Sequence, residues 1–271
     1  MNEFLVIAFL FFIGSLVGWV LELLFRRFIS DANPKRKWIN PGFLVGPYLP
    51  LYGFSLSALY IMAHINVDFI QNEIVRKIVL FCVMAIVITA IEFIAGMIFI
   101  KGMKIKLWDY TNEWCNIKGV ICPKFTFYWV VLSAIYYFCI HQSIQHALHW
   151  LADHLAFSFV IGFFYGIFII DLTYSMNIMA RIRKFAIDNE LEVKYEELKE
   201  VIRRRNEEYK SKVSFMFAMR SDHVSLSDNL KKYLEKYIES GENKIDKLKN
   251  IVADKVVDKV ADKVADRTDR K

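Results

Sequence analysis

The chain has 271 residues, of which 55% are hydrophobic and 15% are aromatic, and its formal net charge is +6. The charges are unevenly distributed, because 22 of the 64 charged side chains lie in residues 1–180 and 42 lie in residues 181–271. A soluble domain averages roughly 45–50% apolar residues. The composition and its split exclude a soluble enzyme, a disordered chain and a disulfide-stapled secreted domain, and they indicate a multi-pass membrane protein with a polar tail.

Five segments are apolar enough to cross a bilayer, which takes about 20 residues each. They predict an all-α fold: a five-span transmembrane helical bundle over residues 1–180, then a helical, highly charged cytoplasmic tail over residues 181–271 with a low-complexity end. In the second segment we expect a regular helix only from about Pro50, because proline suits the first turn of a helix and breaks its interior. The spans are expected near residues 4–25, 42–64, 78–100, 125–148 and 155–179.

The orientation is predicted from Lys and Arg in the connecting loops, which favour the cytoplasmic side. The N-terminus and the four loops carry none, five, two, five and none in turn, and the fifth span is followed at once by Arg181, Arg183 and Lys184. This alternation predicts a cell-membrane protein with its N-terminus outside and its C-terminus in the cytoplasm.

Three carboxylic side chains lie inside the predicted spans, where an ionisable group costs roughly 2.5–3.5 kcal/mol. Glu22 precedes Arg26 by four residues, which favours an ion pair along one helix face. Glu92 and Asp171 are both expected roughly 13–15 Å from the cytoplasmic boundary. Two such groups could share a proton, bind a cation or line a substrate cavity; the alternative is that each is protonated and hydrogen-bonded to a neighbouring helix.

Two other segments are irregular. Residues 40–53, which include Asn40 and Tyr48, hold three prolines and three glycines and are expected to be unwound or re-entrant. Residues 107–122 mix aromatic with polar side chains, which is typical of an interfacial segment folded back on the bundle. Asp109 there also fits a plain capped turn.

The motifs in these segments resemble those of a known protein family. The run from Asn40 to Gly53, Glu92 with Gly96 one turn later, and the Trp108-Asp-Tyr-Thr stretch that leads to Asn116 and Gly119 resemble the putative ABC-transporter type IV family, also called CmpB-like. The resemblance covers roughly residues 5–180, and Thr111 stands where the family more often has Ser. It implies a permease-like subunit that handles an unknown solute.

A partner ATPase is expected as a separate subunit, because the chain has no Gly-x4-Gly-Lys-Ser/Thr phosphate loop. The other expected partners are the lipid bilayer and, as an open alternative, a second copy of the chain; no nucleic acid and no cofactor are expected. The predicted substrate or ion pathway comprises Glu92, Asp171, Glu22, Asn40, Tyr48, Trp108, Asp109, Tyr110 and Asn116.

Two rival functions stay open. One is a membrane-embedded enzyme that acts on a lipid-linked substrate with Glu92 or Asp109 as acid or base, although no nucleophile or metal constellation accompanies these carboxyls. The other is a non-catalytic scaffold whose tail recruits a partner. No metal is expected, because local spacing alone specifies a metal weakly; the histidines considered were His141, His146, His149 and His154.

Two Gly-x3-Gly motifs, Gly14/Gly18 and Gly162/Gly166, predict close helix packing within the chain, with homodimerisation as the alternative.

Overall fold

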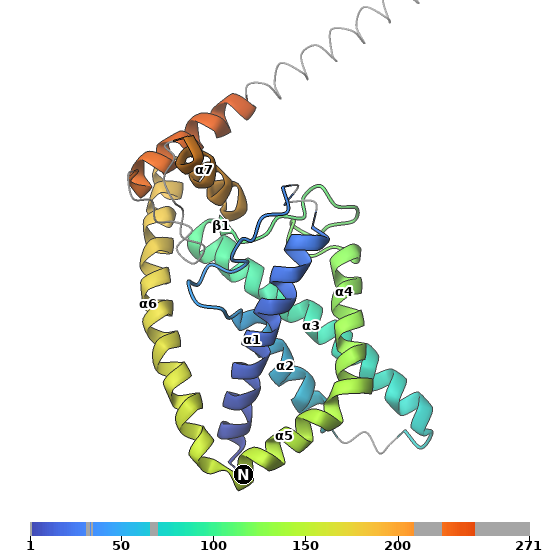
Figure 1. Ribbon diagram of the computed structural model, residues 1–271. Helices are drawn as coiled ribbons and strands as arrows, with labels where there is room; N and C mark the ends of the chain where they lie inside the picture. Colours follow the sequence, from blue (N-terminus) through green and yellow to red (C-terminus); the bar gives the residue numbers. More distant parts are fainter. Residues whose placement is uncertain (1, 31–32, 34, 66–69, 209–223, 242–271) are drawn as a thin grey trace, which may run out of the picture.

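The computed structural model describes residues 2–30, 33, 35–65, 70–208 and 224–241. They are almost entirely helical (Figure 1). The elements in chain order are α1 (Glu3–Phe28), α2 (Pro50–Ala63), α3 (Glu73–Met103), β1 (Ile105–Lys106), α4 (Pro123–Ile135), a π-helical turn (Tyr136–Ile140), α5 (His141–Asp153), a 3-10 turn (Leu155–Phe157), α6 (Ser158–Asp188), β2 (Val193–Lys194), α7 (Tyr195–Glu208) and a last helix over 226–241.

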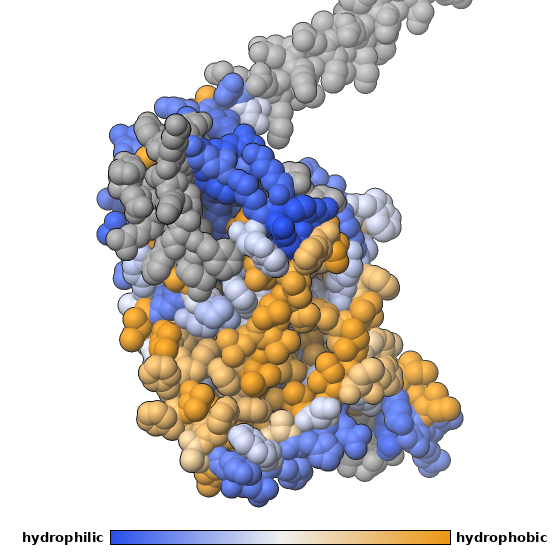
Figure 2. Space-filling model, viewed as in Figure 1, coloured by the Kyte–Doolittle hydropathy of each residue, from blue (hydrophilic) through white to orange (hydrophobic). Residues whose placement is uncertain are grey.

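Four helical stretches of the described chain are long and apolar enough to cross a membrane: Glu3–Phe28, Glu73–Met103, Pro123–Asp153 and Leu155–Asp188. Their exposed side chains are largely apolar, and they form a hydrophobic belt between two hydrophilic ends of the molecule (Figure 2). A belt of this kind is stable only in lipid, since an apolar surface of that size does not stay exposed to water. The protein is therefore an integral membrane protein.

The second predicted span, residues 42–64, is helical only from Pro50 to Ala63. The expectation of a helix start near Pro50 is thus confirmed. The 14-residue helix rises about 21 Å, less than the roughly 30 Å of a hydrocarbon core. Residues 40–49 ahead of it are not helical, and the backbone N–H of Leu49 donates to the carbonyl of Ser15 in the middle of α1, at 2.9 Å. The count of five spans accordingly stays a prediction, with α2 as the short member.

The glycine motif of α1 packs closely against α2. An added Cβ at Gly14 would lie 2.9 Å from the carbonyl oxygen of Tyr52 and 3.1 Å from the Cα of Gly53, both on α2. In α6, by contrast, an added Cβ at Gly162 or Gly166 would meet nothing within 4 Å. The predicted close packing within the chain is confirmed for the first motif and is wrong for the second.

At the α7 end of the molecule, opposite the N-terminus, the tail packs onto the bundle (Figure 1). The strands β1 and β2 pair in parallel, with Ile105 opposite Val193. One apolar cluster unites the ends of α6, β1, β2, α7 and helix 226–241, through buried residues that include Ile105, Met179, Ile182, Val193, Leu198, Ile202, Leu230 and Tyr233. The cluster crosses residue 180, so the two predicted parts of the chain share apolar core in this region.

Candidate functional site

The unwound segment, residues 40–49, is shaped by the side chain of Asn40. Its amide donates to the carbonyls of Leu44 (2.9 Å) and Val45 (3.1 Å), and its oxygen accepts from the indole N–H of Trp19 in α1 (2.9 Å). Because the prolines and glycines here prevent helical hydrogen bonding, the freed carbonyls need other donors. The buried side-chain amide of Asn40 supplies a donor to two of these carbonyls.

Asp171, in the middle of α6, supplies acceptors for the same segment. Its two carboxylate oxygens accept from the backbone N–H of Val45 (3.1 Å) and Gly46 (2.7 Å) and from the hydroxyl of Tyr48 (2.6 Å). A fourth donor is the hydroxyl of Ser175, one turn later on α6, at 2.9 Å. With four donors on two oxygens, this carboxyl is fully engaged in holding the unwound segment against α6.

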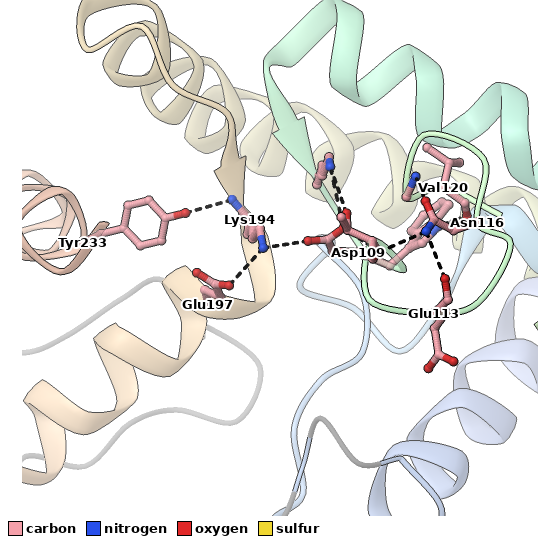
Figure 3. A network of polar contacts seen from close by, with 11 residues as sticks. Asp109, Glu113, Asn116, Val120, Lys194, Glu197 and Tyr233 are labelled. Carbon is pink, nitrogen blue, oxygen red and sulfur yellow. Dashed lines mark hydrogen bonds and ion pairs between the residues drawn. The ribbon is translucent and has the colours of Figure 1, made fainter. Parts of the chain in front are cut away.

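The docked loop, residues 107–122, is the other irregular segment, and it folds on its own hydrogen bonds (Figure 3). Trp108 donates its indole N–H to the carbonyl of Val120 at 2.9 Å, and Asn116 donates to the carbonyls of Thr111 and Glu113 while it accepts from the N–H of Gly119. Gly119 adopts φ +67°, and a side chain at this position would meet Thr111 and Asp109. The motif therefore has glycine where the backbone turns tightly.

Glu92 of α3 faces this loop and is only 3% exposed. Its Oε1 accepts one long hydrogen bond, 3.5 Å, from the hydroxyl of Tyr110, whose ring stacks on Phe125 at 4.1 Å between centroids. No described residue meets hydrogen-bond geometry at its Oε2, although the indole of Trp129 in α4 lies close enough to the carboxyl to act as a weak hydrogen-bond donor. A buried carboxyl oxygen without a partner is costly, at about 1–3 kcal/mol or more. Such a group calls for an explanation other than packing.

Gly96, one turn after Glu92, leaves room for the docked loop. An added Cβ there would clash with the side chain of Val120 and lie 3.3 Å from Trp108. The loop thus contacts α3 over two successive turns, with Tyr110 at Glu92 and with Trp108 and Val120 at Gly96.

Glu22 is linked through Arg26 to α7 by two successive ion pairs. Its carboxylate accepts from Arg26 at 2.9 Å, which confirms the predicted pair, and from the hydroxyl of Tyr52 at 3.0 Å. Arg26 in turn contacts Glu196 of α7 at 2.9 Å. Glu22 also acts electrostatically on Glu92, so these two carboxyls lie near each other.

The tail holds both irregular segments. Lys199 of α7, which is 6% exposed, donates to the carbonyl of Asn40 at 3.1 Å and pairs with Glu196 at 3.2 Å. Burial lowers the pKa of Lys199, although Glu196 opposes this shift. Lys194 of β2 pairs with Asp109 of the docked loop at 2.8 Å (Figure 3). Burial alone would raise the pKa of Asp109, but hydrogen bonds from Lys194 and Thr111 outweigh it and lower the pKa to about 2.

The predicted pathway residues therefore fall into two groups. Asn40, Tyr48 and Asp171 belong to the unwound segment, whereas Trp108, Asp109, Tyr110 and Asn116 belong to the docked loop, with Glu92 beneath it and Glu22 near Glu92. No hydrogen bond among the described residues joins Glu92 to Asp171 directly. Sequence reasoning missed Tyr52, Glu196 and Lys199. The sequence predicted a helical, charged tail over residues 181–271, but nothing in it indicated the partners of the charged residues.

These features define a polytopic helical membrane protein in which two irregular segments meet the bundle near one end. The chain belongs to the family described as "Putative ABC-transporter type IV", which it matches over residues 9–176, more than half of its length. That range contains both segments and all three intramembrane carboxyls, and it ends before β2 and α7. No curated protein and no solved structure matches the chain. Within the described residues, no three His, Cys, Asp or Glu side chains come together as a metal site.

Proposed function

We propose that the chain is the membrane-embedded, permease-like subunit of a transporter. In this proposal the solute or a coupled cation is handled beside Glu92, between α3, the docked loop and the Glu22–Tyr52 pair. The observation that carries the proposal is the unpartnered, buried Oε2 of Glu92, which is available to a proton, a cation or a polar group of a solute.

The irregular backbone supports the same reading. Non-helical backbone at membrane depth is tolerated only where protein or a water-filled cavity satisfies it, and broken helices of this kind are typical of transporters. Here the unwound segment reaches the midpoint of α1 at Ser15, with its polar groups met by Asn40 and Asp171.

The energy source would be a separate ATPase on the cytoplasmic side. The distribution of Lys and Arg predicts that the α7 end of the molecule is cytoplasmic and that the N-terminus is outside. An ATPase at that end would act on β2 and α7, because Lys194 of β2 contacts the docked loop and Lys199 of α7 contacts the unwound segment. Association with a second copy of the chain stays a prediction.

The test is co-purification of the full chain in a mild detergent, followed by protein identification. A stoichiometric P-loop ATPase is expected, and reconstituted complex in lipid vesicles should hydrolyse ATP faster with the wild-type chain than with Glu92→Gln. Recovery of the chain with no ATPase, together with normal growth of cells that carry Glu92→Gln in place of a required wild-type copy, would contradict the permease-like role.

A further inference from the structure

Two histidines from different parts of the chain meet at the end of the molecule opposite α7. His64 directly follows α2, and His141 is the first residue of α5, after the π-helical turn. Figure 1 shows α5 at the end of the molecule opposite α7. Their ring centroids are 5.5 Å apart. Gln145, one turn beyond His141, lies against both rings: its side-chain nitrogen is 3.4 Å from Nε2 of His64 and 3.2 Å from Nε2 of His141.

The hydrogen bonds of the outer ring nitrogens determine where the protons lie. Nδ1 of His64 is 2.9 Å from the carbonyl oxygen of Tyr60, which can only accept, so Nδ1 carries the hydrogen and Nε2 of the neutral ring has a free lone pair. The side-chain nitrogen of Gln145 can only donate, so Nε2 of His141 also presents a lone pair. Nδ1 of His141 then donates to the hydroxyl of Tyr136, at 2.8 Å.

Two imidazole lone pairs are thus directed at one amide N–H2 group. In metal sites the ligating histidine presents one nitrogen to the ion and donates the other N–H to a carbonyl or another oxygen, which fixes the ring. Both rings here have that arrangement, with Tyr60 and Tyr136 in the outer positions. The Gln145 amide nitrogen lies where the cation would bind, so the amide has to move aside for the ion, and its oxygen can then serve as a third ligand.

The π-helical turn is what brings Tyr136 to His141. Residues five apart on a regular α-helix point about 140° away from each other, because each residue turns the helix by about 100°. In the π-helical turn the N–H of His141 bonds to the carbonyl of Tyr136, which stacks the two residues. Single π-helical turns inside α-helices occur frequently at functional sites.

We propose that His64, His141 and Gln145 form a binding site for a divalent cation of the zinc class, with water completing the coordination. Imidazole nitrogens suit zinc, copper and nickel, whereas magnesium and calcium take oxygen ligands. The contacts of this site do not include Glu92, and the site does not depend on the proposed transport role. A cation bound at this site would link the end of the short helix α2 to α5.

The histidines that sequence spacing had grouped do not form this site. Of that group only His141 takes part, while His154 stacks on Trp150 at 4.6 Å and bonds to its carbonyl. His146 and His149 are exposed on α5 and serve as matched controls. The partner that spacing missed is His64, which is 77 positions before His141.

The test is calorimetric titration of ZnCl2 into tag-free, full-length protein in detergent, at pH 7.5. We expect one saturable site, an affinity about 100-fold weaker in His64→Ala, and an affinity about tenfold weaker in Tyr136→Phe, which removes only the outer-shell partner. His149→Ala should bind zinc as the wild type does. Replacing zinc with magnesium should give no binding.

His64 is exposed at a helix end, so its replacement should leave the fold intact even if His141→Ala does not fold. Absence of zinc binding by the folded wild type would overturn the proposal. So would wild-type affinity in a folded His64→Ala variant, or an equal loss in His149→Ala, since either result would place the zinc elsewhere.

Discussion

Asp171 and Glu92 are both intramembrane carboxyls, but their surroundings differ. Asp171 accepts four hydrogen bonds, two of them from the backbone of the unwound segment. Glu92 accepts one long hydrogen bond from Tyr110 and a weak interaction from Trp129, and no described residue meets hydrogen-bond geometry at its second oxygen. The cost of burying an acid is therefore offset locally at Asp171 and not at Glu92.

This difference separates a structural role from a functional one. A carboxylate that satisfies otherwise unpaired backbone N–H groups stabilises the fold, and its loss leaves those groups buried without an acceptor. An incompletely bonded carboxyl contributes little to the fold and is free to bind a proton, a cation or a solute. The comparison predicts that stability depends on Asp171 and activity on Glu92.

The largest effect on either region should come from removal of β2 and α7, because Lys194 of β2 contacts the docked loop and Lys199 of α7 contacts the unwound segment. A chain that ends at Asp188 loses Lys194 and Lys199, and with them Val193, Leu198 and Ile202, each of which is fully buried. We expect it to aggregate in detergent, whereas a chain that ends at Gly241 should elute as a single species in size-exclusion chromatography. If both elute as single species, the tail is not part of the fold.

Asp171→Asn should be strongly destabilising, by about 3 kcal/mol, because the amide turns an N–H2 group toward donors in a buried network. Tyr48→Phe, which removes one of the four donors, should cost only about 1 kcal/mol. Thermal unfolding in detergent measures both. Equal midpoints for wild type and Asp171→Asn would mean that this carboxyl does not hold the unwound segment.

The two glycine motifs offer a matched pair. Gly14→Ala should destabilise by about 1–3 kcal/mol, since the new methyl group meets the α2 backbone, and this contact supports the unwound segment at Ser15. Gly166→Ala has open space and a better helix former, so it should be neutral or stabilising by up to about 1 kcal/mol. A destabilised Gly166→Ala would instead indicate a second chain packed on α6.

The Asp109–Lys194 pair lies on the side of Glu92, and it predicts that the free energy of unfolding depends on pH. The pKa of Asp109 is lowered to about 2, so its stabilisation is fully present above about pH 4 and is lost as the pH falls toward 2. Asp109→Asn should therefore lower the free energy of unfolding at pH 7. The loss should be only about 1 kcal/mol, because the pair is partly exposed. The difference in unfolding free energy between this variant and the wild type should become smaller at pH 3.

The control is Glu113→Gln, which removes the more exposed Glu113–Lys124 pair and should have almost no effect at either pH. A difference between wild type and Asp109→Asn that stays constant from pH 7 to pH 3 would show that the Asp109 carboxylate is not held by Lys194.

Local features of the fold could be predicted from the sequence. Apolar runs identified the long helices, Pro50 marked the start of α2, and four-residue spacing identified the Glu22–Arg26 pair. Each of these depends on neighbours in the chain, for which periodicity and backbone chemistry are direct guides.

Contacts between distant residues could not be predicted in this way. Asp171 and Glu92 looked alike because both are acids at similar expected depth, and only tertiary structure shows that Gly46 reaches one of them and Tyr110 the other. The pairing of Lys199 with Asn40, and of His64 with His141, likewise joins segments that no local pattern relates.

The most direct measurement is growth complementation by Glu92→Gln, made beside its thermal stability and with Asp171→Asn in parallel. Gln keeps the shape of Glu92 and an acceptor for Tyr110, so its unfolding free energy should stay within about 1 kcal/mol of wild type. We predict that Glu92→Gln folds normally and fails to support growth, whereas Asp171→Asn loses stability and growth together. Normal growth of a normally stable Glu92→Gln chain would contradict the functional role of Glu92.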